Sequence, residues 1–150
     1  MIKWITKIQW NKVLLIGFLY TIGSMGVHSV EAMLTMKYYL MPQYFGVWSK
    51  VMMPSTGPPP LMYFAVSAII SFITGVSLTI IYYYLRDYLP KGFWKRASYF
   101  ADLMAAASLV FFTLPVFLMF NVPLALLGSW FVSTFVILVL TSMTIVKIIK

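Results

Sequence analysis

The chain contains no cysteine, one histidine and three acidic residues among its 150 positions. The absence of cysteine excludes a disulfide framework, a thiolate metal site and a cysteine nucleophile. Charged residues of both signs make up 9% of the sequence, whereas about 25% is usual for a soluble domain. So few charges cannot cover a water-exposed surface, and we therefore do not expect a soluble globular protein.

Apolar residues, in contrast, make up 62% of the chain and gather in four long runs. About 20 apolar residues in a helix span the ~30 Å hydrocarbon core of a bilayer. Ten-residue segments of alternating polarity, which are typical of outer-membrane barrels, are absent from the sequence. We predict an all-α integral membrane protein, a four-transmembrane-helix bundle in a single domain over residues 1–150, with helices at approximately 13–36, 61–85, 97–118 and 123–146.

A basic stretch at residues 82–100 divides the apolar runs into two helical pairs, and aromatic residues typical of the headgroup region surround it. Each cation would cost ~2.5 to 3.5 kcal/mol at the centre of a bilayer, so this stretch must lie in water at one membrane face. We expect its cations to contact anionic lipid. They are Arg86, Lys91, Lys95 and Arg96.

The positions of lysine and arginine also predict the orientation. If the N-terminus is cytoplasmic, nine of the 11 basic residues lie on that side, and only Lys37 and Lys50 lie opposite. Cytoplasmic loops of membrane proteins carry such an excess. We therefore predict N-in, C-in topology for a multi-pass protein of the cytoplasmic membrane.

The first apolar segment has two interpretations. A basic stretch at residues 1–12 precedes it, and Val30-Glu31-Ala32 resembles a small-residue cleavage site, so a cleaved signal peptide is one of them. The apolar run is longer than the roughly 7 to 15 residues typical of a signal peptide, which favours a retained helix. We expect residues 1–12 to form a short interfacial turn before this helix.

The connection at residues 37–60 is the longest and is rich in aromatic residues and proline. Pro42 argues against one straight helix, and the aromatic side chains argue against a freely solvated loop, so we expect an interfacial outer loop. Pro60 can open the next helix, because its missing N–H falls where none is needed. The connection at 119–123 is short, which predicts a tight antiparallel hairpin with Asn121 as N-cap and Pro123 in the first helical turn.

Small residues spaced three or four apart predict the faces along which the helices pack, because they allow close approach of a neighbouring backbone. Three such ridges occur: Gly17, Thr21 and Ser24; Ser67, Ser71 and Gly75; and Ala97, Ala101 and Ala105. Pro115 is expected to kink the far end of the third helix.

His28 and Glu31 are three residues apart and share one helix face. They form the clearest candidate site for a proton or a ligand, near the outer boundary of the membrane. The alternative is a polar pair at the outer rim that contacts Lys37 or loop groups. This pair supplies two ligands, fewer than the three or four of a zinc site, so we predict no metal and no cofactor.

Asp102 is expected at the inner end of the third helix, in the opposite leaflet from Glu31, so the two cannot form a paired-carboxylate site. It is either a carboxylate that gates a substrate or ion, or a structural clamp to Arg86 or another cation. Asp87 is expected to be solvated. The cations are split among three membrane-proximal places, which argues against nucleic acid as a partner.

The sequence contains no catalytic motif such as HExxH or GxSxG, so we expect no enzymatic activity. Two functional classes remain. The favoured one is a non-catalytic interaction or accessory subunit, or a scaffold, in contact with membrane lipids and with a second copy or a larger membrane complex. The alternative is a small transporter, or a protein that binds a lipid or lipophile, with its site near His28 and Glu31 in the outer leaflet. A transport pathway would require a dimer, because four helices enclose only a narrow core.

Overall fold

A computed structural model of the chain describes residues 8–55 and 57–149. Within this part the secondary structure is entirely helical, and four helices are long and apolar enough to cross a membrane. The prediction of an all-α membrane protein with four spans is confirmed in this respect. The expected interfacial turn at residues 1–12 lies largely outside the described residues, because residues 1–7 are not among them.

The first two spans are single α-helices, α1 (Trp10–Tyr39) and α2 (Leu61–Leu85). Helix α1 is longer at both ends than the predicted 13–36, and α2 has the predicted bounds. A 3₁₀ helix, η2 (Pro42–Val47), lies in the connection between them. Pro60 precedes α2 with an extended backbone (φ −70°, ψ 161°) and occupies the N-cap position at the start of this helix.

The third span consists of three consecutive segments: α3 (Phe93–Ser108), the π-helical η3 (Leu109–Thr113) and α4 (Leu114–Met119). Pro115 lacks an N–H and crowds the carbonyl one turn earlier, which accounts for a local widening of the helix just before it. The structure therefore has a π-helical segment just before this proline, where the sequence predicts a kink. The span begins after Gly92, whose φ of 102° is a conformation that residues with a Cβ rarely adopt.

The fourth span is α5 (Leu124–Ile148), which forms an antiparallel hairpin with the third. Pro123 occupies the N-cap position, and no side chain caps the helix. The expected N-cap role of Asn121 and the placement of Pro123 inside the first turn are therefore not what the structure has. The proline supplies the extended conformation that separates the two helices.

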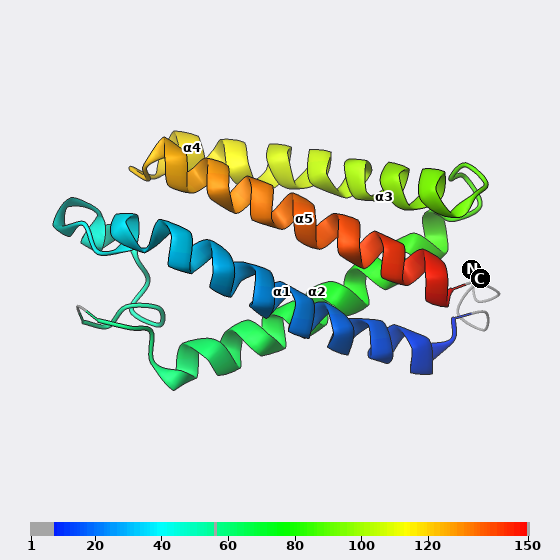
Figure 1. Ribbon diagram of the computed structural model, residues 1–150, viewed down its shortest axis with the longest axis horizontal. Helices are drawn as coiled ribbons and strands as arrows, with labels where there is room; N and C mark the ends of the chain where they lie inside the picture. The colour runs from blue at the N-terminus through cyan, green and yellow to red at the C-terminus, as the bar shows by residue number, and fades with distance from the viewer. Residues whose placement is uncertain (1–7, 56, 150) are drawn as a thin grey trace.

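In space the helices lie side by side in a row, in the order α2, α1, α5 and α3 (Figure 1). They do not surround a common axis along their whole length. Helix α1 packs against α2 on one side and α5 on the other, and α5 packs against α3. We call the end that holds the start of α1, residues 86–92 and the end of α5 the basic end. The opposite end, with residues 40–60 and 120–123, is the loop end.

All four spans meet at the basic end. The buried cluster there includes Val13 and Ile16 of α1, Tyr82 of α2, Phe100 of α3 and Ile145 of α5, each at most 1% exposed. The rings of Tyr82 and Phe100 lie edge to face with centroids 5.3 Å apart. Toward the loop end α2 crosses α1 and diverges from α5 and α3 (Figure 1), so the bundle is closed at one end only.

Candidate functional site

A buried carboxyl group lies between α1 and α5 in the half of the molecule toward the loop end. Glu31 is 8% exposed, and its Oε1 accepts a hydrogen bond from Ser129 Oγ of α5 at 2.6 Å. Thr35, one turn further along α1, places its Oγ1 2.8 Å from the same Oε1. The carboxyl therefore joins two helices that are about 100 residues apart in the sequence.

The two hydroxyl groups around Glu31 each have a second acceptor within reach. Thr35 Oγ1 lies 2.8 Å from the backbone carbonyl of Glu31, and Ser129 Oγ lies 2.7 Å from the carbonyl of Leu126. A hydroxyl has one proton to donate and can also accept. The network can therefore be completed with a carboxylate that accepts from both hydroxyls. It can equally be completed with a carboxylic acid that donates to one hydroxyl while both hydroxyls turn to backbone carbonyls.

His28 does not take part in this network. Its side chain is exposed, and within the described residues it makes no hydrogen bond or ion pair with Glu31. The predicted contact between His28 and Glu31 is absent because the two side chains have different surroundings. Glu31 is turned into the α1–α5 interface, where Ser129 provides a donor, and His28 lies at the surface of α1. Lys37 is also separate, since its Nζ lies over the ring of Tyr38, 5.0 Å from the centroid.

An aromatic cluster lies on the loop-end side of Glu31. It consists of Tyr39 at the end of α1, Trp48 of the outer loop and Trp130 of α5, with ring centroids 5.1 to 6.4 Å apart. Trp130 Nε1 donates to Tyr39 Oη at 2.6 Å, and Trp48 Nε1 donates to the Tyr39 carbonyl at 3.1 Å. These contacts hold Trp48 of the 40–60 connection against the α1–α5 pair.

The sequence did not point to Ser129 or Thr35 as partners of Glu31, or to Tyr39 and Trp130 as a hydrogen-bonded pair. One signal was available, since Glu31, Thr35 and Tyr39 are four residues apart and lie on one helix face. Ser129 stands five residues after the start of α5, which places it ~8 Å into that helix at the loop end. Matching depths along two antiparallel helices would have brought these residues together.

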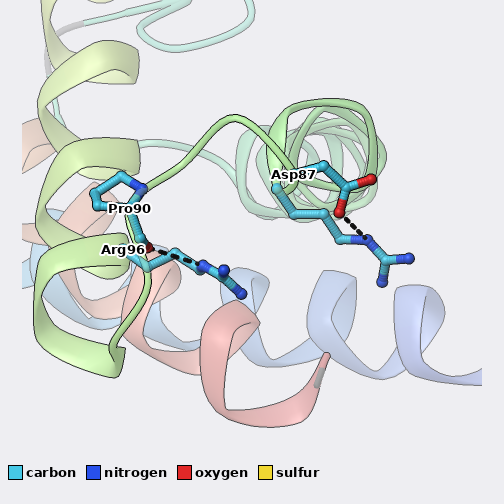
Figure 2. A network of polar contacts seen from close by, with 4 residues as sticks. Asp87, Pro90 and Arg96 are labelled. Atoms are coloured by element: carbon cyan, nitrogen blue, oxygen red, sulfur yellow. Dashed lines mark hydrogen bonds and ion pairs between the residues drawn. The ribbon is translucent and has the colours of Figure 1, made fainter.

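Asp102 takes no part in this network, and among the described residues it does not form a clamp with Arg86, one of the two roles that the sequence left open. The Asp102 side chain is exposed on α3, and within the described residues no cation lies within 4.0 Å of it. Arg86 instead pairs with Asp87, with 3.8 Å between Nε and Oδ1 (Figure 2). Its guanidinium also lies over the Tyr83 ring, 5.2 Å from the centroid. Asp87 is nonetheless 66% exposed, so it is largely solvated.

The four cations expected at anionic lipid differ in their surroundings. Arg96 Nε donates to the Pro90 carbonyl at 3.2 Å, which ties the start of α3 to the preceding turn (Figure 2). Lys91 and Lys95 are exposed. Both arginines use only Nε in these contacts, so their outer nitrogens are not part of them.

The predicted packing ridges lie at helix contacts to different extents. A Cβ added to Gly75 would stand 2.6 Å from Tyr20 Cβ and 3.0 Å from Gly17 Cα, so the two glycines form the crossing point of α1 and α2. Ala97, Ala101 and Ala105 are buried, as is Ser24. Thr21, Ser67 and Ser71 are half-buried, because α2 has already begun to leave the bundle at the two serines.

Within residues 8–55 and 57–149, no group of three or more His, Cys, Asp or Glu side chains could hold a metal ion. No protein-family model, no curated protein sequence and no solved structure matches the chain. The function must therefore be argued from the site and from the surfaces that the helices leave open.

Proposed function

We propose that this membrane protein is a non-catalytic interaction subunit, which offers the open faces of α2 and of its third span to helices of a larger assembly. The observation that carries this proposal is the uneven burial of the spans. In the most apolar window of the third span 6% of the residues are buried, against 33% in α5. The third span thus packs along α5 and leaves most of its surface uncovered.

The open surface is largest toward the loop end. Phe111 and Leu118 of the third span are 82% and 84% exposed, and Leu61 and Met62 of α2 are 84% and 67% exposed. In a bilayer, helices associate through close van der Waals packing and polar contacts rather than through a hydrophobic driving force. Helix α2, which diverges toward the loop end, and the uncovered side of the third span therefore have surface available for helices of another chain.

The proposal places the protein in the cytoplasmic membrane with both termini inside. It is supported by the gathering of the start of α1, the 86–92 turn and the end of α5 at one end of the molecule, and by the excess of basic residues in these segments. Because the chain has no cysteine, single cysteines can report on each side. A cysteine at Tyr88 should be protected from a membrane-impermeant maleimide in intact cells, and one at Val51 should react.

The assembly is tested by the mass of the particle that contains the chain. Membranes are solubilised directly into native lipid nanodiscs, and the tagged protein is weighed by mass photometry. The proposal predicts a particle heavier than one 17.2 kDa chain with its lipid. The double variant Phe111→Ala, Leu118→Ala should reduce that mass, whereas the matched change Met33→Ala, Leu34→Ala on exposed α1 positions should not. A single-chain particle for the unaltered protein would contradict the proposal.

A second candidate function is the binding of a lipophilic cation near Glu31. A buried carboxyl close to a cluster of Tyr39, Trp48 and Trp130 combines the two groups that attract an organic cation. This reading predicts that the purified protein binds tetraphenylphosphonium and that Glu31→Gln removes the binding. His28→Ala should leave it unchanged, since His28 lies outside the network. Equal binding by the Glu31→Gln protein would eliminate this candidate.

A further inference from the structure

The third span carries small residues on two adjacent faces. On one face Ala97, Ala101 and Ala105 are buried, at 3%, 0% and 6% exposure, and this face packs on α5. On the next face Ser98, Asp102 and Ala106 have the same spacing, and all three are exposed. The second face thus combines the small residues that permit close helix approach with a carboxylate at its centre.

The depth of Asp102 makes this face unsuited to lipid. Asp102 is the tenth residue of α3, about 13 Å from the start of the helix at 1.5 Å per residue. If a ~30 Å hydrocarbon core is centred on the span Phe93–Met119, Asp102 lies about 9 Å inside its boundary. Tyr99 and Leu103 beside it are 62% and 47% exposed. Carboxylates within membrane spans nearly always face a protein interior or a partner charge rather than acyl chains.

Among the residues that the structure describes, the chain does not offer a cation at this depth. Its basic residues stand before the spans, after them or within about one turn of their ends, and Lys95 and Arg96 precede Asp102 by seven and six residues. Two copies that met through this face in the same orientation would bring two carboxylates together, and like charges repel. Charge complementarity therefore points to a different polypeptide.

We infer that the Ser98–Asp102–Ala106 face is the docking site for a transmembrane helix of another protein, and that this helix carries a lysine or arginine about one third of the way into the membrane. The inference rests on the proposed function and deepens it, since it names the face and the chemistry of the partner. The small residues let the two backbones approach, and the buried ion pair sets the register of the helices.

The test uses the purified full chain in liposomes with synthetic single-span polyleucine helices. One peptide carries an arginine at the depth of Asp102, and three others carry leucine, glutamine or glutamate there. Association is measured by energy transfer between labelled protein and peptide. The arginine peptide should bind about tenfold more tightly than the leucine peptide, as one interhelical polar contact allows. Asp102→Asn should remove this preference, and Asp102→Lys should transfer it to the glutamate peptide.

Leu103→Asn is the matched control, because it adds the same amide group at the neighbouring exposed position and leaves the carboxylate in place. It should keep the preference for arginine. Since Asp102 is exposed, its variants should elute and fold like the unaltered protein, which circular dichroism can verify. Equal binding of the arginine and leucine peptides would overturn the inference, and so would a preference that survives in Asp102→Asn.

Two further outcomes separate this inference from the proposed function. Energy transfer between copies of the chain that disappears in Asp102→Asn would show the face to be a homodimer interface and would overturn the assignment to another polypeptide. A heavy native particle together with no peptide preference would leave the proposed function standing and remove only the docking face. A single-chain native particle together with an intact preference for the arginine peptide would remove the proposed function and leave the docking face standing.

Discussion

The two ends of the molecule are held together by different interactions. At the basic end side chains from all four spans interlock, with Tyr82 and Phe100 ring against ring. In the half toward the loop end α1 and α5 are joined by the Glu31 network and the aromatic cluster, while α2 leaves the row. The basic end is therefore joined by apolar packing of all four spans. The half toward the loop end is joined by a few polar and aromatic contacts, and its outer faces remain open.

The largest expected effect comes from removing a buried side chain at the basic end. Phe100→Ala removes a ring that is 1% exposed and should lower the free energy of unfolding by about 3 to 5 kcal/mol. Phe111→Ala makes the same change where the ring is 82% exposed and should alter it by less than ~0.5 kcal/mol. Reversible unfolding in mixed detergent micelles measures both. Similar losses for the two variants would mean that the ends do not differ in packing.

The next effect should arise at the point where α2 begins to diverge. Gly75→Ala introduces a Cβ 2.6 Å from Tyr20 Cβ, so α1 and α2 must separate, at a cost of about 1 to 3 kcal/mol. Gly23→Ala is the control, because no heavy atom lies within 4 Å of the added Cβ. Unfolding under the same conditions should show a loss for the first variant only. If Gly75→Ala left the stability unchanged, α1 and α2 would be further apart at their crossing than they are in the structure.

A smaller effect is expected from the polar contacts between α1 and α5. Ser129→Ala removes the donor to Glu31 Oε1 and should lower the free energy of unfolding by about 0.6 kcal/mol, the average for hydrogen bonds between membrane helices, and by no more than ~1.7 kcal/mol. Ser29→Ala loses only a contact to its own helix, at Met25, and should be close to neutral. If Ser129→Ala were equally neutral, the network would contribute no stability to this half.

The smallest effect should have the opposite sign. Tyr82 Oη is buried and has no hydrogen-bond partner among the described residues, so Tyr82→Phe should leave the stability unchanged or raise it by up to about 1 kcal/mol. Tyr83→Phe, next to it, loses the hydrogen bond from the Gln9 N–H at 3.2 Å and should be mildly destabilising. A clear loss in Tyr82→Phe would show that its hydroxyl has a partner after all.

The number of spans and two of the packing faces were predictable from the sequence, because both depend on local spacing. Four apolar runs of sufficient length give four spans, and small residues that recur at helical spacing place Gly17 and Gly75 on packing faces. Which helices contact one another was not predictable in the same way. Small residues mark one side of α2, but its sequence does not specify which helix meets that side or where α2 diverges from α5 and α3.

The candidate site shows the same limit. Glu31 was an evident candidate because acids within spans are rare, but the choice of His28 as its partner assumed that neighbours in the sequence are neighbours in the fold. The actual donor, Ser129, is 98 residues away, and serine is too common in membrane helices to stand out. Asp102 was likewise assigned a cation of the same chain, and the exposure of its face became visible only when α3 was placed against α5.

The divergence of α2 is the claim on which the rest depends, and distances between spin labels test it most directly. Because the chain has no cysteine, pairs of labels can be added cleanly, one at Tyr84 and Tyr99 near the basic end and one at Phe64 and Phe117 near the loop end. In lipid nanodiscs the account predicts a clearly longer distance for the loop-end pair than for the basic-end pair. Equal short distances would describe a bundle closed along its whole length and would contradict the account.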